Sequence, residues 1–295
     1  MTFNEFVEAL YRPWARANKA SYKKADEVYL KPILTEFGPI ELSAVQAINV
    51  EAYKQQRTAT ATRFNRARKP ASVNRELECV RRIFSYAIEC GILEDNPAAS
   101  VRKLRAQNAR NRYLSHEEES QLISILQRRG GYLYSLVVLA IETGARKGEL
   151  INLEWSQFNR LAGTIWLPQT KTGRPREVPL SHRAMRAIER QQGQDEKRIF
   201  PIRDFKKAWA SVLSRVGIEN FKFHDLRHTA ATRWAEAGAD IFTIAALLGH
   251  HNIQTTMRYS HSGLNRMRQV VEKRTNMSRV GLEPTTHWLK ARRLG

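Results

Sequence analysis

Apolar residues recur at three- and four-residue intervals through the first hundred residues, and this spacing predicts helices. The clearest helix is predicted at 74–92, where Gly91 and then Asn96-Pro97 supply stop signals. Earlier helical patterns occupy 2–16, 20–36 and 43–57. This part of the sequence has no strand-like alternation, so we expect a small domain made of helices.

The pattern changes after residue 112 and predicts a second domain. Ser115-His-Glu-Glu has the spacing of a capping box at a helix start, and an apolar helix predicted at 132–143 ends at Gly144. Residues 163–180 hold short apolar runs interrupted by prolines and a turn-rich Lys-Thr-Gly-Arg-Pro, which is typical of a β-hairpin. Further helices are predicted near 182–192, 203–216, 224–237, 240–248, 253–260 and 264–274. We expect a mainly α fold with a small β-hairpin or sheet (α+β) in this domain.

The net charge of the chain indicates what kind of partner it binds. The 295 residues contain 49 Lys and Arg against 29 Asp and Glu, a net charge of +20, and such an excess favours binding to nucleic acid. The stretch 101–112 contains five bases and no acid, so it is either a solvated loop or a linker that follows a phosphate backbone. We expect the chain to divide into a helical domain, a basic linker, a second domain and a basic tail, at 1–105, 106–112, 113–275 and 276–295.

Several classes of protein are disfavoured by the same sequence. No apolar run approaches the ~20 residues of a membrane helix, and the N-terminus lacks the basic-then-apolar pattern of a secretion signal. The only cysteines, Cys79 and Cys90, fall on one predicted helix and cannot form a disulfide framework. We therefore expect a cytoplasmic protein, nucleoid-associated when bound to DNA, with no membrane partner.

Histidines and arginines supply the candidate chemistry. His224 and His228 are four residues apart, so both imidazoles lie on one helix face, as a zinc pair requires. Arg227 opposes that interpretation because a fixed cation on the adjacent turn repels a dication. Near a helix start, Arg227 is also suited to hold a phosphate. Solvated histidines, a zinc pair and an anion site all remain open at this point.

A tyrosine and more cations lie in the same predicted domain. Arg146 follows a helix-ending glycine, and Glu149 is spaced to brace its guanidinium. Lys171 is expected at the hairpin tip, where an ammonium can reach a ligand. Tyr259 has a hydroxyl that is a poor nucleophile at neutral pH unless a base takes its proton and cations neutralise the electrophile. A packing role for Tyr259 is the alternative.

Five motifs together resemble the tyrosine recombinase family, which includes the phage integrases. They are Thr-Gly-Ala-Arg-Lys-Gly-Glu-Leu from Thr143, Thr-Lys-Thr-Gly-Arg from Thr170, His-Asp-Leu-Arg-His-Thr from His224, Leu-Gly-His from Leu248 and Tyr-Ser-His from Tyr259. The helical N-terminal part at 1–105, especially from Ser72 to Pro97, also resembles the core-binding domain of that family. The resemblance covers about residues 2–272.

The resemblance implies a site-specific recombinase that is independent of metal, cofactor and ATP. Tyr259 would attack the scissile phosphate and form a 3′-phosphotyrosine, which preserves the bond energy for rejoining. Arg146 and Arg227 would hold the non-bridging oxygens, and Lys171 would protonate the leaving 5′-oxygen. His224 would accept the tyrosine proton. The remaining implied catalytic residue is His250, a hydrogen-bond donor to the phosphate.

Partners and biological role follow from the same resemblance. The family implies double-stranded DNA at an attachment or recombination site, a homotetramer on that DNA, and accessory DNA-bending or directionality proteins. Integration or excision of a phage or other mobile element is the first interpretation. A housekeeping recombinase that resolves chromosome dimers and a non-catalytic DNA-binding regulator of the same fold are the alternatives, with a zinc hydrolase at the 224–228 pair outside the family.

Overall fold

The computed structural model describes residues 1–19, 22, 26–62, 64–105, 112–168, 174–202 and 204–259. The chain divides into two compact units, Met1–Arg110 and Asn111–Gly295, and each is described by itself. Lys171, most of the predicted linker, the predicted helix at 264–274 and the tail 276–295 lie outside the described residues. Within those residues, no helix has the length and apolar character that crossing a bilayer requires.

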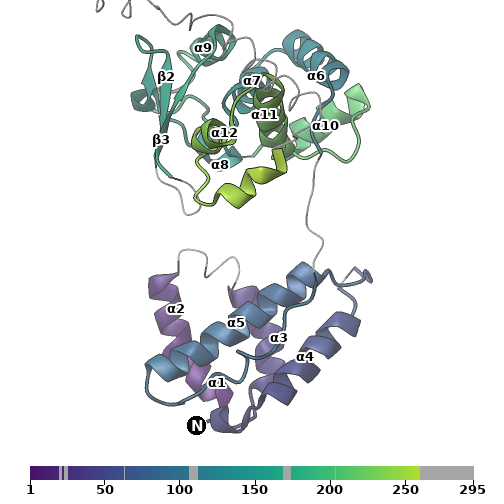
Figure 1. The fold of residues 1–295 in the computed structure, drawn as a ribbon, viewed down its shortest axis with the longest axis vertical. Helices are drawn as coiled ribbons and strands as arrows, with labels where there is room; N and C mark the ends of the chain where they lie inside the picture. Colours follow the sequence, from purple (N-terminus) through teal and green to yellow (C-terminus); the bar gives the residue numbers. More distant parts are fainter. Residues whose placement is uncertain are drawn as a thin grey trace, which may run out of the picture. The chain divides into compact units, whose positions relative to one another are not determined.

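The first unit is helical, as its sequence predicts (Figure 1). Its longest helix has a strongly apolar face that packs against the other helices through residues such as Leu77, Val80 and Phe84, all fully or almost fully buried. The elements are α1 (Phe3–Phe6), a π-helical turn (Val7–Tyr11), α2 (Arg12–Asn18), α3 (Asp26–Phe37), a 3-10 turn (Leu42–Ala44), α4 (Ala47–Ala59) and α5 (Pro70–Glu89).

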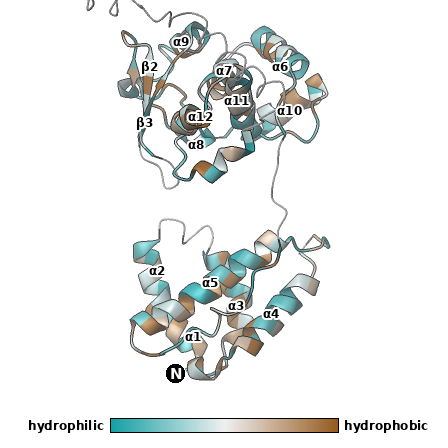
Figure 2. Ribbon diagram, viewed as in Figure 1, coloured by the Kyte–Doolittle hydropathy of each residue, from teal (hydrophilic) through white to brown (hydrophobic). Residues whose placement is uncertain are grey.

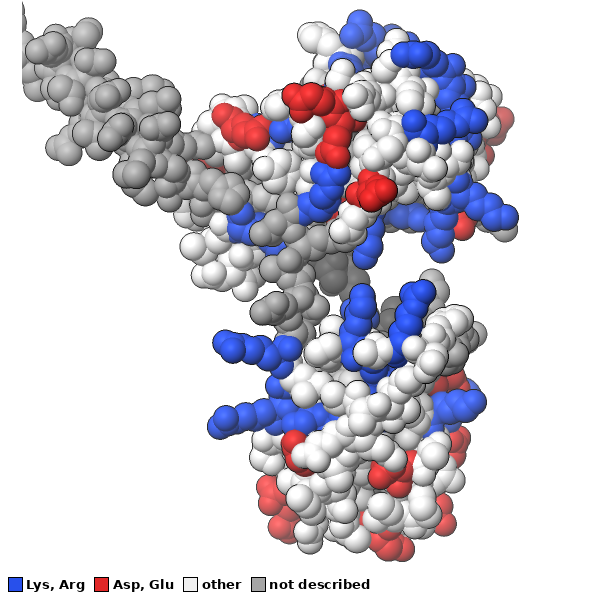
Figure 3. All heavy atoms as spheres, turned by 90° about the vertical axis from the view of Figure 1, so that its right-hand side faces the viewer, with Lys and Arg blue, Asp and Glu red and all other residues white. Residues whose placement is uncertain are grey.

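Basic residues of this unit sit on a segment that is fixed to α5. The Asn74 side chain accepts a hydrogen bond from the Leu104 backbone N–H at 2.8 Å and donates one to the Leu104 carbonyl at 2.9 Å. Arg102, Lys103 and Arg105 are exposed on this segment. Figure 3 shows Lys and Arg gathered toward one end of the helical unit, with Asp and Glu mainly toward the other end.

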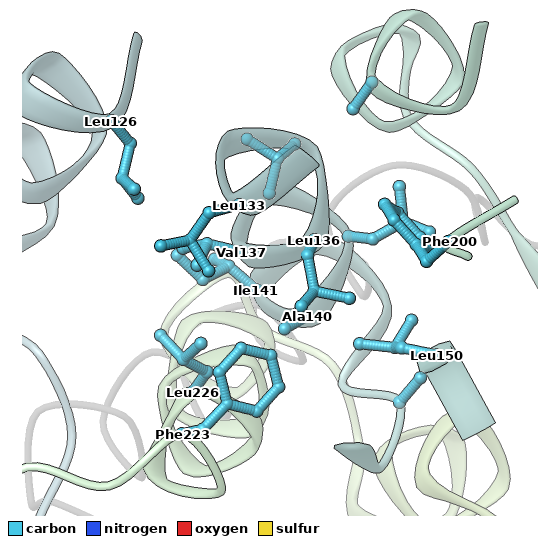
Figure 4. Close-up of a cluster of buried hydrophobic side chains, with 14 of the residues drawn as sticks. Leu126, Leu133, Leu136, Val137, Ala140, Ile141, Leu150, Phe200, Phe223 and Leu226 are labelled. Carbon is cyan, nitrogen blue, oxygen red and sulfur yellow. The ribbon is translucent and has the colours of Figure 1, made fainter. Parts of the chain in front are cut away.

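The second unit surrounds one buried helix, α7 (Tyr132–Thr143). Side chains from the neighbouring helices and from the segment near Phe200 converge on α7, as Figure 4 shows for Leu126, Leu150 and Leu226. The helices are α6 (His116–Arg129), α7, α8 (Lys147–Ile151), α9 (His182–Glu189), α10 (Lys206–Val216), α11 (Asp225–Glu236) and α12 (Ile241–Leu248), with 3-10 turns at Trp155–Gln157, Ile253–Thr255 and Met257–Tyr259. Figure 2 shows hydrophobic and hydrophilic residues mixed along these helices, as expected for amphipathic helices.

A three-stranded antiparallel sheet lies beside these helices. Its order is β1 (Phe158–Asn159), β2 (Thr164–Leu167) and β3 (Arg176–Pro179), and β2 pairs with β3 from Thr164 opposite Pro179 to Leu167 opposite Arg176. Side chains on β3 alternate between buried and exposed, so Arg176 and Val178 point inward. The expected mainly helical fold with a small sheet is confirmed.

Element boundaries differ from the sequence prediction in two informative places. The helix predicted at 74–92 begins at Pro70, because proline is well suited to the first turn, and ends at Glu89 before Cys90 and Gly91. The single helix predicted near 253–260 is instead a pair of three-residue 3-10 turns. That prediction was wrong, and the bent backbone brings Tyr259 back against α11 and α12.

Candidate active site

The predicted site residues sit where helices end or begin. α7 ends at Gly144, whose φ of 58° places it in the left-handed region, and Arg146 then caps the start of α8. His224 occupies the cap position before α11. α12 ends at Gly249, with φ of 66°, and His250 follows directly. These helix ends expose backbone carbonyls that can fix charged side chains.

Arg227 is held by two such carbonyls. Its Nη1 donates to the Gly144 carbonyl at 2.8 Å and its Nη2 to the Leu248 carbonyl at 2.6 Å, and the residue is only 4% exposed. Burial, followed by the charges of Arg146 and Arg176, lowers the pKa of Arg227 to about 9. The guanidinium is therefore fixed in place next to other cations, and a bound anion would relieve their repulsion.

Glu149 is the buried carboxylate of this cation cluster. It accepts hydrogen bonds from the Arg146 backbone N–H at 2.7 Å and from Arg146 Nη1 at 3.0 Å, so the bracing that the spacing predicts is confirmed. Arg176 donates to both carboxylate oxygens, at 3.1 and 2.9 Å. Burial alone raises the pKa of Glu149, but the hydrogen bonds from Arg176 and Arg146 outweigh it and hold the pKa below its ordinary value.

Arg176 is a residue that the sequence interpretation missed. Besides the pair with Glu149, its Nε donates to the Leu247 carbonyl at 2.7 Å, so Arg176 and Arg227 together hold the last two carbonyls of α12. The available signal was the inward position of Arg176 in the alternating strand β3. In a chain with 49 basic residues, that signal did not stand out.

The three histidines of the site are neutral at neutral pH. Burial and then His224 and Arg258 lower the pKa of His228 to about 4. Burial and then Arg227 lower the pKa of His250 to about 3, and His250 Nδ1 lies 2.7 Å from Thr256 Oγ1. Desolvation and then Arg227 also lower the pKa of His224, although that residue keeps an exposed surface.

Tyr259 lies buried at the end of the last 3-10 turn. The residue is 8% exposed and packs with Ala231, Ile244 and Leu248 from α11 and α12. Burial raises the pKa of Tyr259, against the opposing effects of Arg258 and Arg227, so the phenol is protonated at neutral pH. Its hydroxyl lies 2.5 Å from Nδ1 of His228, a residue to which the family resemblance assigns no catalytic role.

The structure brings five of the six predicted catalytic residues into one electrostatic cluster. Arg146 and Arg227 both act on the pKa of His224 and of His250, and Arg227 acts on that of Tyr259. Lys171, the sixth, is outside the described residues. Throughout the described part of the chain, no three His, Cys, Asp or Glu side chains are grouped to hold a metal ion.

Comparisons with a family model and with known proteins point to the same family. Residues 112–266 match the model of the phage integrase family. The chain is 32% identical over 274 residues to a shufflon-specific DNA recombinase of Escherichia coli, covering 84% of this chain and 71% of that protein. It is 31% identical over 207 residues to the integrase of Escherichia phage P2 (68% and 58% covered) and 28% identical over 228 residues to the tyrosine recombinase XerC of Erythrobacter litoralis (71% and 74% covered).

Solved structures share the fold at lower sequence identity. A Tn1549 transposon integrase in complex with circular intermediate DNA superposes with a TM-score of 0.72 at 17% identity, covering 92% of this chain and 99% of that chain. A lambda integrase dimer bound to a core site superposes with a TM-score of 0.69 at 19% identity, covering 86% and 97%. The likeness extends over both units of the chain.

Proposed function

The chain belongs to the phage integrase family of site-specific tyrosine recombinases, and we propose that it cleaves and rejoins duplex DNA through a covalent bond between Tyr259 and a 3′-phosphate. The single observation that supports this best is the position of Tyr259. It packs against α11, where the positive charge of the fixed Arg227 guanidinium acts to lower the pKa of its phenol. A nucleophile beside rigid cations is the arrangement that phosphoryl transfer needs.

Each site residue has a role in this proposal. Tyr259 Oη gives up its proton to a neighbouring imidazole and attacks phosphorus, the O–P bond forms, and the bond to the 5′-oxygen breaks. Arg146 and Arg227 stabilise the negative charge that accumulates on the non-bridging oxygens, and their fixed positions reduce the reorganisation needed during reaction. Lys171 supplies the proton to the departing 5′-oxygen.

His224 and His250 would also bind the phosphate. His250 is held through Nδ1 by Thr256, and a neutral imidazole fixed in this way can donate from Nε2. His224, at the start of α11 near Arg146 and Arg227, has an exposed surface suited to the same anion. Because the phosphodiester energy is kept in the tyrosine ester, rejoining requires no nucleotide cofactor.

The partner in this proposal is double-stranded DNA, and the working form is four copies of the chain on two duplexes. The shufflon recombinase and the P2 integrase among the relatives favour a mobile-element role, integrating or excising DNA. The XerC relative keeps the chromosome-resolving role as the alternative. A strain deleted for the gene separates them: loss of one element's mobility supports the first role, and accumulated chromosome dimers support the second.

Covalent capture tests the chemistry. The full chain is mixed with a randomised pool of nicked duplexes, which trap adducts because the cut fragment diffuses away, and the bound DNA and the modified residue are identified by sequencing and mass spectrometry. We expect adducts on Tyr259, formed equally well in chelator, and none with Tyr259→Phe. An adduct that persists in the phenylalanine variant, or no adduct with the wild-type chain, contradicts the proposal.

A further inference from the structure

The hydroxyl of Tyr259 contacts the second histidine of the His-Asp-Leu-Arg-His motif, which is His228. Nδ1 of His228 lies 2.5 Å from the Tyr259 hydroxyl, and the two ring centroids are 5.8 Å apart. The ring of His224, which the family resemblance suggests as proton acceptor, has its centroid 5.7 Å from that of His228. Among the described residues, the hydrogen bond of the hydroxyl is to His228.

The direction of this hydrogen bond follows from the chemistry of the two groups. A phenol is a better donor than acceptor because its lone pair is delocalised into the ring. A neutral imidazole has one nitrogen that can accept. His228 is neutral because burial opposes its protonation, and so do the neighbouring His224 and the cations Arg258 and Arg227, against a favourable effect of Asp225. The hydroxyl therefore donates to Nδ1, and Nε2 carries the imidazole proton.

We propose that His228 is the proton acceptor for Tyr259 during strand cleavage and the proton donor to it during rejoining, an inference that rests on the proposed recombinase function. In cleavage, the Tyr259 O–H bond breaks as the O–P bond forms, and the proton moves to Nδ1 of His228. The 5′-oxygen leaves with a proton from the general acid. Rejoining reverses both transfers, so each group returns to its starting state without any further reactant.

Protonation of His228 is coupled to DNA binding in this arrangement. In the free protein, burial raises the pKa of Tyr259 and lowers that of His228 to about 4, so proton transfer between them is unfavourable. A phosphate held by Arg146 and Arg227 compensates the cations that disfavour a charged imidazole. Because the proton moves as the O–P bond forms, free phenolate does not accumulate, and the nucleophile is inactive without DNA.

A set of histidine variants tests the assignment. His228→Asn places an amide oxygen near the position of Nδ1, so the hydrogen bond can persist while proton acceptance is lost. We expect the rate of adduct formation on the captured duplex to fall by about 10²–10⁴-fold, with DNA affinity within a few-fold of wild type. His224→Asn is the direct comparator, and His182→Asn, in an exposed position on α9, is the matched control with an unchanged rate.

A more acidic nucleophile separates proton transfer from packing. A fluorinated tyrosine, inserted only at position 259, loses its proton more easily and depends less on a base. We expect it to restore His228→Asn by at least about tenfold relative to its effect on the wild-type chain. A loss of rate without this rescue assigns His228 a structural role, and an unchanged rate in His228→Asn, or rescue of His224→Asn alone, also overturns the inference.

The same experiment keeps the two proposals distinct. If the wild-type chain forms adducts on Tyr259 and His228→Asn does so at the same rate, the recombinase function stands and the role of His228 fails. If the wild-type chain forms no adduct, or if Tyr259→Phe still forms one, the recombinase proposal itself fails. Circular dichroism of each variant, together with a second variant, His228→Gln, shows that the loss of rate does not come from misfolding.

Discussion

Arg176 and Glu149 form a two-pronged ion pair, with nitrogen–oxygen distances of 3.1 and 2.9 Å, and their side chains are only 6% and 2% exposed. This pair joins strand β3 to helix α8. Since Arg176 also holds the Leu247 carbonyl and Glu149 also holds Arg146, one buried interaction connects the sheet, the end of α12 and a predicted catalytic arginine. The position of Arg146 therefore depends on a buried ion pair that lies outside the predicted catalytic set.

Arg176→Gln should destabilise the second unit by about 3–5 kcal/mol, because it leaves the Glu149 carboxylate buried without its main partner. The matched control is Arg160→Gln, which breaks the Arg160–Glu189 pair at the surface, where Arg160 is 67% exposed, and should cost less than about 1 kcal/mol. Urea unfolding of both variants measures the difference. Similar free energies of unfolding for the two variants would contradict the importance of the buried pair.

Gly144→Ala tests the close packing beside Arg227. A Cβ at Gly144 would lie 2.9 Å from Leu248 Cδ2 and 2.9 Å from Trp234 Cη2, whereas one at Gly217 would meet nothing within 4 Å. Both glycines have similar left-handed backbones, with φ of 58° and 73°. We expect alanine to cost about 1–2 kcal/mol at Gly217 from the backbone alone, and about 1–3 kcal/mol more at Gly144. Equal losses in thermal or urea unfolding would rule out the steric argument.

Stability should fall as pH decreases from about 6.5 towards 4. The pKa of His228 is about 4 and that of His250 about 3 in the folded protein, both below the ordinary value of 6.5, so the unfolded chain binds more protons in this window. Each histidine should contribute a loss on the order of 1–2 kcal/mol, given its partial exposure. Urea titrations at several pH values should show a flatter dependence in His228→Asn and His250→Asn.

Much of the fold follows from local pattern, and the exceptions have tertiary causes. The spacing of apolar residues predicts α5 and α7, and Gly144, Gly217 and Gly249 end helices where left-handed glycines are expected. The sequence predicts one helix near 253–260. The segment forms 3-10 turns instead, with Tyr259 buried against α11 and α12, a contact that no local pattern encodes.

The candidate site is also only partly predictable from local sequence patterns. Motif spacing identifies Arg146, Arg227 and Tyr259 as candidates, and the structure clusters them. The spacing cannot say whether His224, at the cap of α11, or His228, within it, meets Tyr259, because the tyrosine lies 31 residues away from His228 in sequence. The sequence also does not pair Arg176 with Glu149, because the two residues are 27 positions apart.

DNA binding should depend steeply on salt. Arg102, Lys103 and Arg105 are exposed on the segment that Asn74 fixes to α5, where they can neutralise phosphates. Replacing all three with glutamine should reduce the slope of log affinity against log salt by about 2–3, because each phosphate contact contributes roughly 0.9. The matched control exchanges lysine for arginine and arginine for lysine at the three positions and should keep the slope. An unaltered slope in the glutamine variant would place the DNA elsewhere.

Lys171 provides the last prediction, and it concerns the leaving group. If its ammonium protonates the 5′-oxygen, Lys171→Ala should slow cleavage of normal DNA by about 10²–10⁴-fold while leaving DNA affinity nearly unchanged. A substrate in which sulfur replaces the bridging 5′-oxygen needs no such proton, because a thiolate is a stable leaving group, so it should restore the variant to near the wild-type rate. Arg227→Ala is the control: it removes charge stabilisation rather than a proton, and sulfur should not restore it. Equal defects of Lys171→Ala on the oxygen and sulfur substrates, measured as single-turnover adduct formation, would remove the lysine from this role.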